Sequence, residues 1–161
     1  MEELSLEAAY RSWAPDLVAF AATVGGSESA ADAVADVFQR LLADPDRWAA
    51  VSNPRSYLLR SVANSARAIA RSDGRRRARE DRDWSMACPE GGDAASSSSL
   101  LVDRSLQTAL STLSSQQRSV VFLTYWLDES VDGAAEILGV RPGTVRRQLA
   151  RARQKLRGAL S

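Results

Sequence analysis

Apolar residues recur every three or four positions in the first part of the chain, a spacing that is typical of amphipathic helices. One stripe runs over residues 6–24 and stops at Gly25-Gly26, after which Ser27 is placed to cap the next helix. A second stripe over residues 30–41 stops at Asp44-Pro45, because the residue before a proline avoids the helical conformation. The chain therefore opens with two predicted helices.

A third helix is predicted after a short connector that runs from Asp46 to Ser52. Asn53 can cap this helix and Pro54 fits its first position, which together make a strong start signal. Its apolar stripe covers residues 57–69, and we expect it to end in the arginine-rich stretch that begins at Arg71. Three helices with matching stripes predict a small bundle.

The helical pattern fails between about Gly74 and Val102. Residues 86–99 contain a proline, two glycines and four consecutive serines, which is typical of a flexible linker. A loop of that length is unusual inside one compact domain, so we place a domain boundary here. The sequence thus predicts an all-α protein with a helical domain over residues 1–73, a flexible linker over 74–102 and a second helical domain over 103–161.

Helical signals return in the second predicted domain. One helix is expected over residues 103–112, and the next starts with Ser114 and Gln117 at capping-box spacing. Ser130 is placed to cap a short helix, which a longer one follows from about Pro142. The residues expected to face inward from the helix after Ser114 are Val120, Val121, Thr124 and Leu127.

The segment from residue 132 onward has the pattern of a helix-turn-helix. Gly139 can adopt the positive φ of a tight turn, Val140 is expected to fill the turn from inside, and Pro142 opens the second helix. In this motif the second helix lies in the DNA major groove, where its N-terminal residues contact the bases. The expected core stripe of that helix is Val145, Leu149, Ala152 and Leu156.

The net charge of +1 hides two strongly charged segments. Residues 1–50 hold nine acidic residues against three arginines, whereas residues 141–157 hold seven basic residues and no acid. Such polarity indicates an acidic face for a protein partner and a basic face for a polyanion.

The last helix supplies candidate DNA contacts. Arginine can pair with guanine and glutamine with adenine, so Arg147, Gln148 and Arg151 are expected at base edges or adjacent phosphates. Arg141, Arg146, Arg153 and Arg157 are better suited to clamp phosphates. The full set of candidate contacts on this helix is Arg141, Thr144, Arg146, Arg147, Gln148, Arg151 and Lys155.

Composition disfavours several classes of function. Histidine is absent and Cys88 is the only cysteine, so we expect no metal site, no cofactor and no catalytic residues. The acidic start and the lack of a long apolar run predict a cytoplasmic protein that does not enter a membrane. A small-molecule substrate is not expected either.

Both predicted domains resemble parts of one protein family. The stretches LSSQQRSVVFLTY over residues 113–125, AEILGV over 135–140 and GTVRRQLARAR over 143–153 resemble region 4 of extracytoplasmic-function (ECF) sigma factors, which belong to the sigma-70 family. The stretches ADAVADVFQR over residues 31–40 and SYLLRSVAN over 56–64 are similar to region 2 of the same family. The resemblance implies a factor that binds core RNA polymerase and directs promoter-specific transcription initiation, with region 2 recognising the −10 element and region 4 the −35 element.

The resemblance also implies roles for residues of the first domain. Residues on its second helix would bind the polymerase, and these are Asp32, Asp36, Gln39 and Arg40. The connector and the third helix would bind the unpaired −10 strand, with one base flipped into a pocket. The candidate −10 contacts are Trp48, Asn53, Arg55, Arg60, Asn64, Arg67 and Arg71. An anti-sigma factor is a further partner that the resemblance leaves open.

Three alternatives stay open. A stand-alone helix-turn-helix transcriptional regulator would need a dimerisation surface and a ligand or phosphorylation domain, and the first three helices offer no receiver motif. A helical nuclease needs clustered carboxylates, and Asp128, Glu129 and Asp132 lie close in sequence but in an expected loop. A pure protein-interaction module is disfavoured by the acid-free terminal segment.

Overall fold

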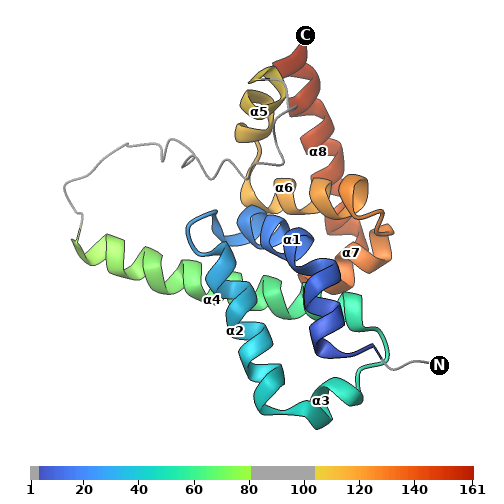
Figure 1. The fold of residues 1–161 in the computed structure, drawn as a ribbon. Coiled ribbons are helices and arrows are strands. Elements are labelled where there is room, and N and C mark those ends of the chain that lie inside the picture. Colours follow the sequence, from blue (N-terminus) through green and yellow to red (C-terminus); the bar gives the residue numbers. More distant parts are fainter. Residues whose placement is uncertain (1–3, 81–103) are drawn as a thin grey trace. The chain divides into compact units, whose positions relative to one another are not determined.

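The computed structural model describes residues 4–80 and 104–161, with side chains over 4–74 and 105–161 (Figure 1). The chain divides into two compact units, Met1–Glu90 and Gly91–Ser161. Within the described residues every regular element is helical, which confirms the predicted all-α class.

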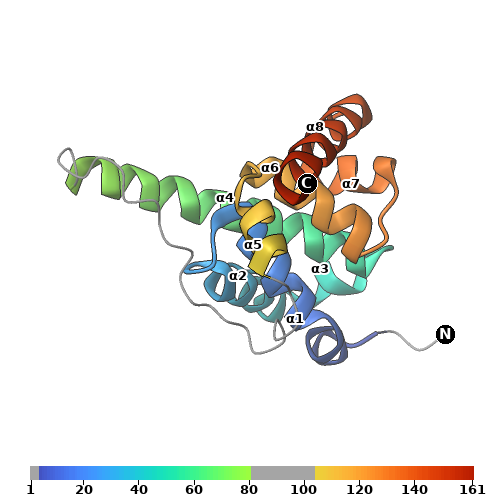
Figure 2. The same ribbon diagram turned by 90° about the horizontal axis from the view of Figure 1, so that it is seen from above.

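The first unit is built from α1 (Leu6–Gly25), α2 (Ala30–Ala43), the short α3 (Pro45–Ala49) and α4 (Pro54–Glu80). The three long helices α1, α2 and α4 pack against one another in pairs, as the two ribbon views show (Figures 1 and 2). Their apolar stripes meet in one core, so the predicted bundle is present. The larger buried side chains of this core are Leu17, Phe20, Val34, Val37, Phe38, Leu41, Leu58, Leu59 and Val62.

Gly25 allows α1 to approach α4 closely. A Cβ atom at this position would lie 2.6 Å from the carbonyl oxygen of Ala66, which is closer than side chains pack. Gly26 follows with a φ of 96°, and its backbone N–H donates to the carbonyl of Ala22. The glycine pair therefore ends the helix, as predicted, and also sets the spacing between two helices.

The segments around α2 and α3 differ from the sequence predictions. Ser27 does not cap α2, which begins later; Ser29 occupies the N-cap position, and its side chain makes no capping hydrogen bond. The expected connector contains α3, whose start is capped when the Asp44 carboxylate accepts a hydrogen bond from the backbone N–H of Arg47. Asp44 thus ends one helix and starts the next, a double role that the sequence reading missed.

α4 begins as predicted but extends further. The Asn53 side chain accepts a hydrogen bond from the backbone N–H of Ser56, so the expected cap is confirmed. The helix continues to Glu80, well past Arg71, because arginine, alanine and glutamate are good helix formers that outweigh the single Gly74. The remainder of the predicted linker, residues 81–102, lies outside the described residues.

The second unit contains α5 (Arg104–Ser111), α6 (Ser115–Val121), the π-helical turn η1 (Phe122–Trp126), α7 (Val131–Leu138) and α8 (Pro142–Leu160). Helices α5, α6 and α7 all pack against α8, so the longest helix of the unit is its central support. The core consists mainly of Leu113, Val120, Leu123, Leu127, Ala134, Ile137, Leu138, Val145, Leu149 and Ala152.

The predicted start and stop signals of this unit are confirmed. Ser114 and Gln117 form a reciprocal capping box at the start of α6. The Ser130 hydroxyl accepts a hydrogen bond from the backbone N–H of Gly133 at the start of α7. Gly139 ends α7 in the left-handed conformation, with a φ of 67°. Val140 is only partly buried in the turn that follows.

The residues that face inward around the π turn after α6 differ in part from the prediction. The backbone N–H of Leu127 donates to the carbonyl of Phe122, five residues earlier, so the turn holds one residue more than an α-helical turn. Leu123, three residues after the buried Val120, is in the core, and Tyr125 is exposed. Thr124, which an α-helical pattern predicts to face inward, is only partly buried, as is Val121.

Candidate nucleic-acid interfaces

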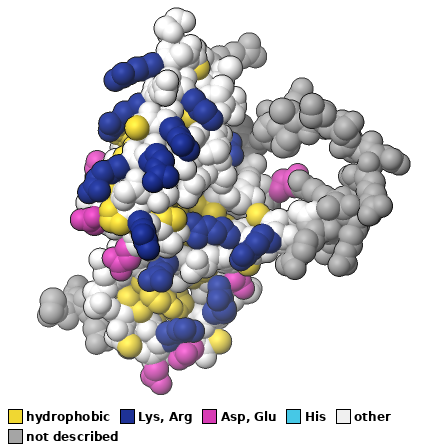
Figure 3. All heavy atoms as spheres, turned by 180° about the vertical axis from the view of Figure 1, so that it is seen from behind, with side chains coloured by type: hydrophobic (Ala, Val, Ile, Leu, Met, Phe, Trp, Pro, Cys, Tyr) yellow, Lys and Arg dark blue, Asp and Glu magenta, His cyan; other side chains and the backbone are white. Residues whose placement is uncertain are grey.

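The second helix of the predicted helix-turn-helix presents arginines on the side away from the core. Val145, Leu149 and Ala152 are buried against the other helices of the unit. Arg146, Arg147 and Arg151 are exposed, and none of their side chains has a hydrogen-bond or ion-pair partner among the described residues. Figure 3 shows Lys and Arg side chains gathered on one face of this unit. Arg141 is likewise exposed, at the N-cap position of α8.

One flank of α8 is engaged by its neighbours. The Gln148 side chain, partly buried, is hydrogen-bonded to Gln116 and to Gln117 of α6. The Lys155 ammonium lies 3.1 Å from the side-chain oxygen of Gln117. Thr144 is on the same flank and is partly buried. The residues expected to contact DNA thus fall into two groups, one facing outward and one facing α6.

The other flank of α8 packs against the π turn. The Nε atom of Arg153 donates to the Tyr125 hydroxyl at 2.8 Å, and its guanidinium carbon lies 5.7 Å from the centre of the tyrosine ring. Arg153 is therefore held as a surface contact between two helical elements.

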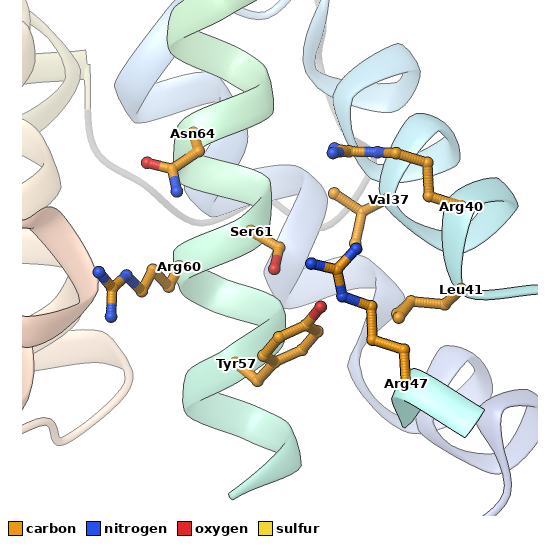
Figure 4. Close-up of a pocket in the computed structure, with 8 residues that line it drawn as sticks. All are labelled: Val37, Arg40, Leu41, Arg47, Tyr57, Arg60, Ser61 and Asn64. Carbon is orange, nitrogen blue, oxygen red and sulfur yellow. The ribbon is translucent and has the colours of Figure 1, made fainter. Parts of the chain in front are cut away.

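A pocket of about 310 Å³ lies between α2, α3 and α4 in the first unit. Its volume is at the lower end of the ~300–1,000 Å³ range of small-molecule sites. Figure 4 shows the Arg47 side chain reaching between Tyr57 and Leu41, whereas Arg60 and Asn64 point to the other side of α4. No acidic residue is among its lining residues, which are Val37, Arg40, Leu41, Arg47, Tyr57, Arg60, Ser61 and Asn64.

The candidate −10 residues of α4 lie along one line of the helix surface. Arg60, Asn64 and Arg71 are exposed and follow one another at helical spacing, and Arg60 and Asn64 also border the pocket. Arg67, on the same line, is partly buried, and burial lowers the pKa of its guanidinium, with a further contribution from the charge of Arg71. Arg55, near the start of α4, is also partly buried.

The connector residues have structural partners. The indole N–H of Trp48 donates to the backbone carbonyl of Leu4 at 2.9 Å and so links α3 to the start of the chain. Asn53 is exposed and caps α4. The pocket is therefore lined by Arg47 rather than by Trp48, and it includes Tyr57, which the sequence pattern indicated only as part of a core stripe.

The candidate polymerase-binding residues lie on α2, where Asp32, Gln39 and Arg40 are exposed. Asp36 is partly buried, and one of its carboxylate oxygens accepts hydrogen bonds from the Arg40 guanidinium and from the Ser65 hydroxyl, both at 2.8 Å. Ser65 is a buried residue of α4 that gave no signal in the sequence. The Asp36 carboxylate therefore connects the surface of α2 to α4.

Among the described residues, no group of three or more His, Cys, Asp or Glu side chains is arranged to hold a metal ion, and this includes Asp128, Glu129 and Asp132. Over the same residues, no helix has both the length and the apolar character needed to cross a membrane.

A helix-turn-helix with an acid-free second helix, together with a basic pocket on a separate helical unit, defines a two-domain DNA-binding protein. The family models of Sigma-70 region 2 and Sigma-70 region 4 match residues 9–76 and 103–156. The ECF RNA polymerase sigma factor EcfG of Rhodopseudomonas palustris (strain TIE-1) is 32% identical over 149 residues, which cover 91% of this chain and 80% of the relative. The chain belongs to the ECF RNA polymerase sigma factors.

Two solved structures share its fold. The sigma factor RpoE of Bartonella quintana, crystallised with the anti-sigma factor NepR, superposes with a TM-score of 0.72 at 25% identity, covering 96% of this chain and 95% of that one. CnrH, solved in complex with the cytosolic domain of CnrY, superposes with a TM-score of 0.58 at 22% identity, covering 96% of this chain and 86% of that one.

Family membership establishes the general function. The protein is a DNA-binding regulator that binds core RNA polymerase and directs promoter-specific transcription initiation through regions 2 and 4. This function is favoured over that of a stand-alone helix-turn-helix regulator.

Proposed function

We propose that the first unit binds promoter DNA as a single strand and that the second unit binds it as a duplex. The first unit takes an unpaired base of the −10 strand into the pocket between α2, α3 and α4, and the second unit lays α8 in the major groove of the −35 duplex. The observation that carries the proposal is the contrast between a concave basic pocket and an exposed arginine face on a helix-turn-helix.

The chemistry of the pocket supports an unpaired nucleotide as its occupant. Tyr57 offers a ring on which a base can stack, and Arg47 supplies positive charge for the backbone phosphates. Arg60, Asn64 and Arg71 continue along the exposed line of α4, where a strand leaving the pocket would run. Trp48 and Asn53 contribute mainly by holding α3 and the start of α4 in place.

Arg147 and Arg151 are the base-contacting arginines of this proposal, and Arg141 and Arg146 bind phosphates. Arginine pairs with two acceptors on guanine in the major groove, and each good pair contributes about 1–3 kcal/mol of discrimination. Arg141 and Arg146 neutralise phosphates, so the affinity for DNA falls as salt rises. The logarithm of the binding constant should fall with the logarithm of the salt concentration with a slope of about −0.9 per phosphate contacted.

Core polymerase binds the exposed face of α2 in this account. Asp32, Gln39 and Arg40 make the contacts, and Asp36 fixes the direction of the Arg40 side chain through their ion pair. The protein acts in the cytoplasm and performs no catalysis of its own, because the polymerase carries out the chemistry.

An anti-sigma factor is a further partner in this proposal. The Bartonella quintana structure pairs a similar sigma factor with such a regulator. Pull-down with the full chain as bait, from cells that carry its gene, is expected to recover a protein that competes with core polymerase. Recovery of polymerase subunits alone would argue against such a regulator.

Transcription from a random promoter library tests the proposed function. The full chain is mixed with core polymerase, and the templates that yield run-off transcripts are sequenced. We expect two enriched elements separated by about two helical turns, roughly 70 Å of duplex. A folded chain that yields no transcript from any template would overturn the proposal.

A further inference from the structure

The flank of α8 that faces α6 carries a connected set of side-chain amides. Gln117 is 6% exposed, and its side-chain oxygen accepts hydrogen bonds from the backbone N–H of Ser114 at 3.0 Å and from the Lys155 ammonium at 3.1 Å. Its side-chain NH₂ donates to the amide oxygen of Gln148 at 3.3 Å. One buried residue of α6 thus connects a helix cap to two residues of α8.

Both ends of the Gln148 amide are occupied. Its oxygen accepts from Gln117, and its NH₂ donates to the amide oxygen of Gln116 at 3.0 Å. Recognition of adenine by glutamine requires the same donor and the same acceptor at once. Gln148 would therefore have to give up both hydrogen bonds to α6 before it could contact a base in this way.

Lys155 is held in a similar manner. Besides its contact with Gln117, its ammonium lies 3.4 Å from the backbone carbonyl of Thr112, the residue after α5. The ammonium therefore binds two oxygens of its own unit.

The outward face of α8 is a quarter turn away from this flank. Arg147, Ala150 and Arg151 stand at helical positions i, i+3 and i+4, which lie on one face, and all three are exposed. The two guanidiniums have no hydrogen-bond or ion-pair partner among the described residues. Ala150 places a methyl group beside Arg147 on this face, and an apolar side chain of this size can contact the methyl group of thymine.

We infer that Arg147, Ala150 and Arg151 read the −35 bases, and that Gln148 is a positioning residue that fixes α8 against α6. The inference rests on the proposed function and names the residues that select the sequence. The three base-reading residues lie on the side of α8 opposite Val145 and Leu149, which are buried in the core. Guanine is the base class that the two arginines select, and thymine is the class that Ala150 favours.

The test compares base preference across variants of the full chain bound to core polymerase. Labelled promoters carry every single-base change in the −35 element, and affinity is measured for each. Gln148→Met keeps the length of the side chain but removes its amide and so both hydrogen bonds to α6, and Gln116→Ala removes one of these two from the α6 side. Both variants are expected to lower the affinity for all promoters evenly, by less than about tenfold, with the order of promoters unchanged.

Arg147→Ala and Arg151→Ala are expected to behave differently. Each is expected to remove discrimination at one base pair, an effect of about 5- to 150-fold at that position. Ala150→Ser is expected to reduce the preference for one thymine by a smaller factor.

The opposite pattern would overturn the inference. If Gln148→Met abolished selection at one base pair while Gln116→Ala did not, Gln148 would be a base-reading residue. If Arg147→Ala and Arg151→Ala preserved every base preference of the wild type, the assignment of this face of α8 to base reading would be wrong. A wild-type protein that shows no −35 preference at all would instead contradict the proposed function itself.

Discussion

Helices α4 and α8 are the long basic helices of the two units, yet they expose their arginines in different surroundings. On α4, Arg67 is partly buried and its pKa is lowered, and Arg60 borders a pocket that α2 and α3 complete. On α8, Arg147 and Arg151 project from a single helix with no neighbouring wall. The same residue type therefore contributes to a concave site in one unit and to an open face in the other.

This difference matches the two forms of DNA at a promoter. An unpaired base can enter a pocket and stack on an aromatic ring, whereas a paired base exposes only its edge in a groove. A pocket depends on the packing of several helices, but an open face depends on a few side chains. Changes to packing should therefore affect the −10 site more, and changes to single arginines should affect the −35 site more.

The largest effect is expected for Gly25→Ala. The added Cβ would lie 2.6 Å from the Ala66 carbonyl and push α1 from α4, at a cost of about 1–3 kcal/mol in the free energy of unfolding. For a unit of this size each kcal/mol lowers the melting temperature by about 4–8 °C. Thermal unfolding measures the change, and binding of a −10 single strand should weaken while −35 duplex binding persists.

Gly74→Ala is the matched control, because it also adds a methyl group to a helix of the first unit. Nothing lies within 4 Å of the new Cβ, so this variant should be neutral or more stable by up to about 1 kcal/mol. Equal destabilisation by the two variants would show that the close approach at Gly25 has no special role.

Tyr57→Leu tests the pocket without a large change in buried volume. Loss of base stacking is expected to weaken binding of a −10 single strand to the polymerase complex by about 1–3 kcal/mol. Fluorescence titration with labelled oligonucleotides measures this affinity. Tyr125→Leu removes an aromatic ring that is 57% exposed on the second unit and should leave single-strand binding unchanged. The pocket assignment fails if both variants behave alike.

Gly139→Ala is expected to have a smaller effect, confined to the second unit. At a φ of 67° an alanine is strained by about 1–2 kcal/mol, and the turn between α7 and α8 carries this strain. Gly158→Ala, with open space around its Cβ, serves as the control. Denaturant unfolding should separate the two, and a stable Gly139→Ala protein would mean that the turn tolerates another conformation.

The smallest effect is expected for Asp36→Asn. The ion pair with Arg40 is about half exposed, and exposed pairs contribute about 0.2–1 kcal/mol. The asparagine can still accept from Ser65, so stability should change little. Affinity for core polymerase, measured by competition, should fall by only a few-fold, and less than for Asp32→Asn. A larger loss would mean that Asp36 itself touches the polymerase.

The sequence predicted those features that depend on short-range chemistry. The caps at Asn53, Ser114 and Ser130 and the left-handed Gly139 could be placed because each requires only a few neighbouring residues. Helical spacing alone placed Val145, Leu149 and Ala152 of α8 in the core, whereas Leu156, predicted with them, is only partly buried. The all-α class and the helix-turn-helix rest on these local signals.

Features that depend on tertiary packing were missed. Helix α3 depends on a cap from Asp44, which the pattern used only to end α2, and the π turn over Phe122–Trp126 has no counterpart in helical periodicity. The partners of Gln148 lie on α6, more than thirty residues away in the chain. Residue spacing within α8 could not show that the Gln148 amide is hydrogen-bonded to α6 while the neighbouring Arg147 side chain has no partner among the described residues.

Transcription from promoters with and without the −35 element tests the central claim most directly. Wild type and the Arg147→Ala/Arg151→Ala protein are compared on a selected promoter and on a version whose −35 bases are scrambled. The account predicts that scrambling lowers the transcript output of the wild type at least tenfold, on the order of the loss of one arginine–base contact. Scrambling should lower the output of the variant no further. A variant that matches wild type on the intact promoter, or that remains sensitive to scrambling, would contradict the account.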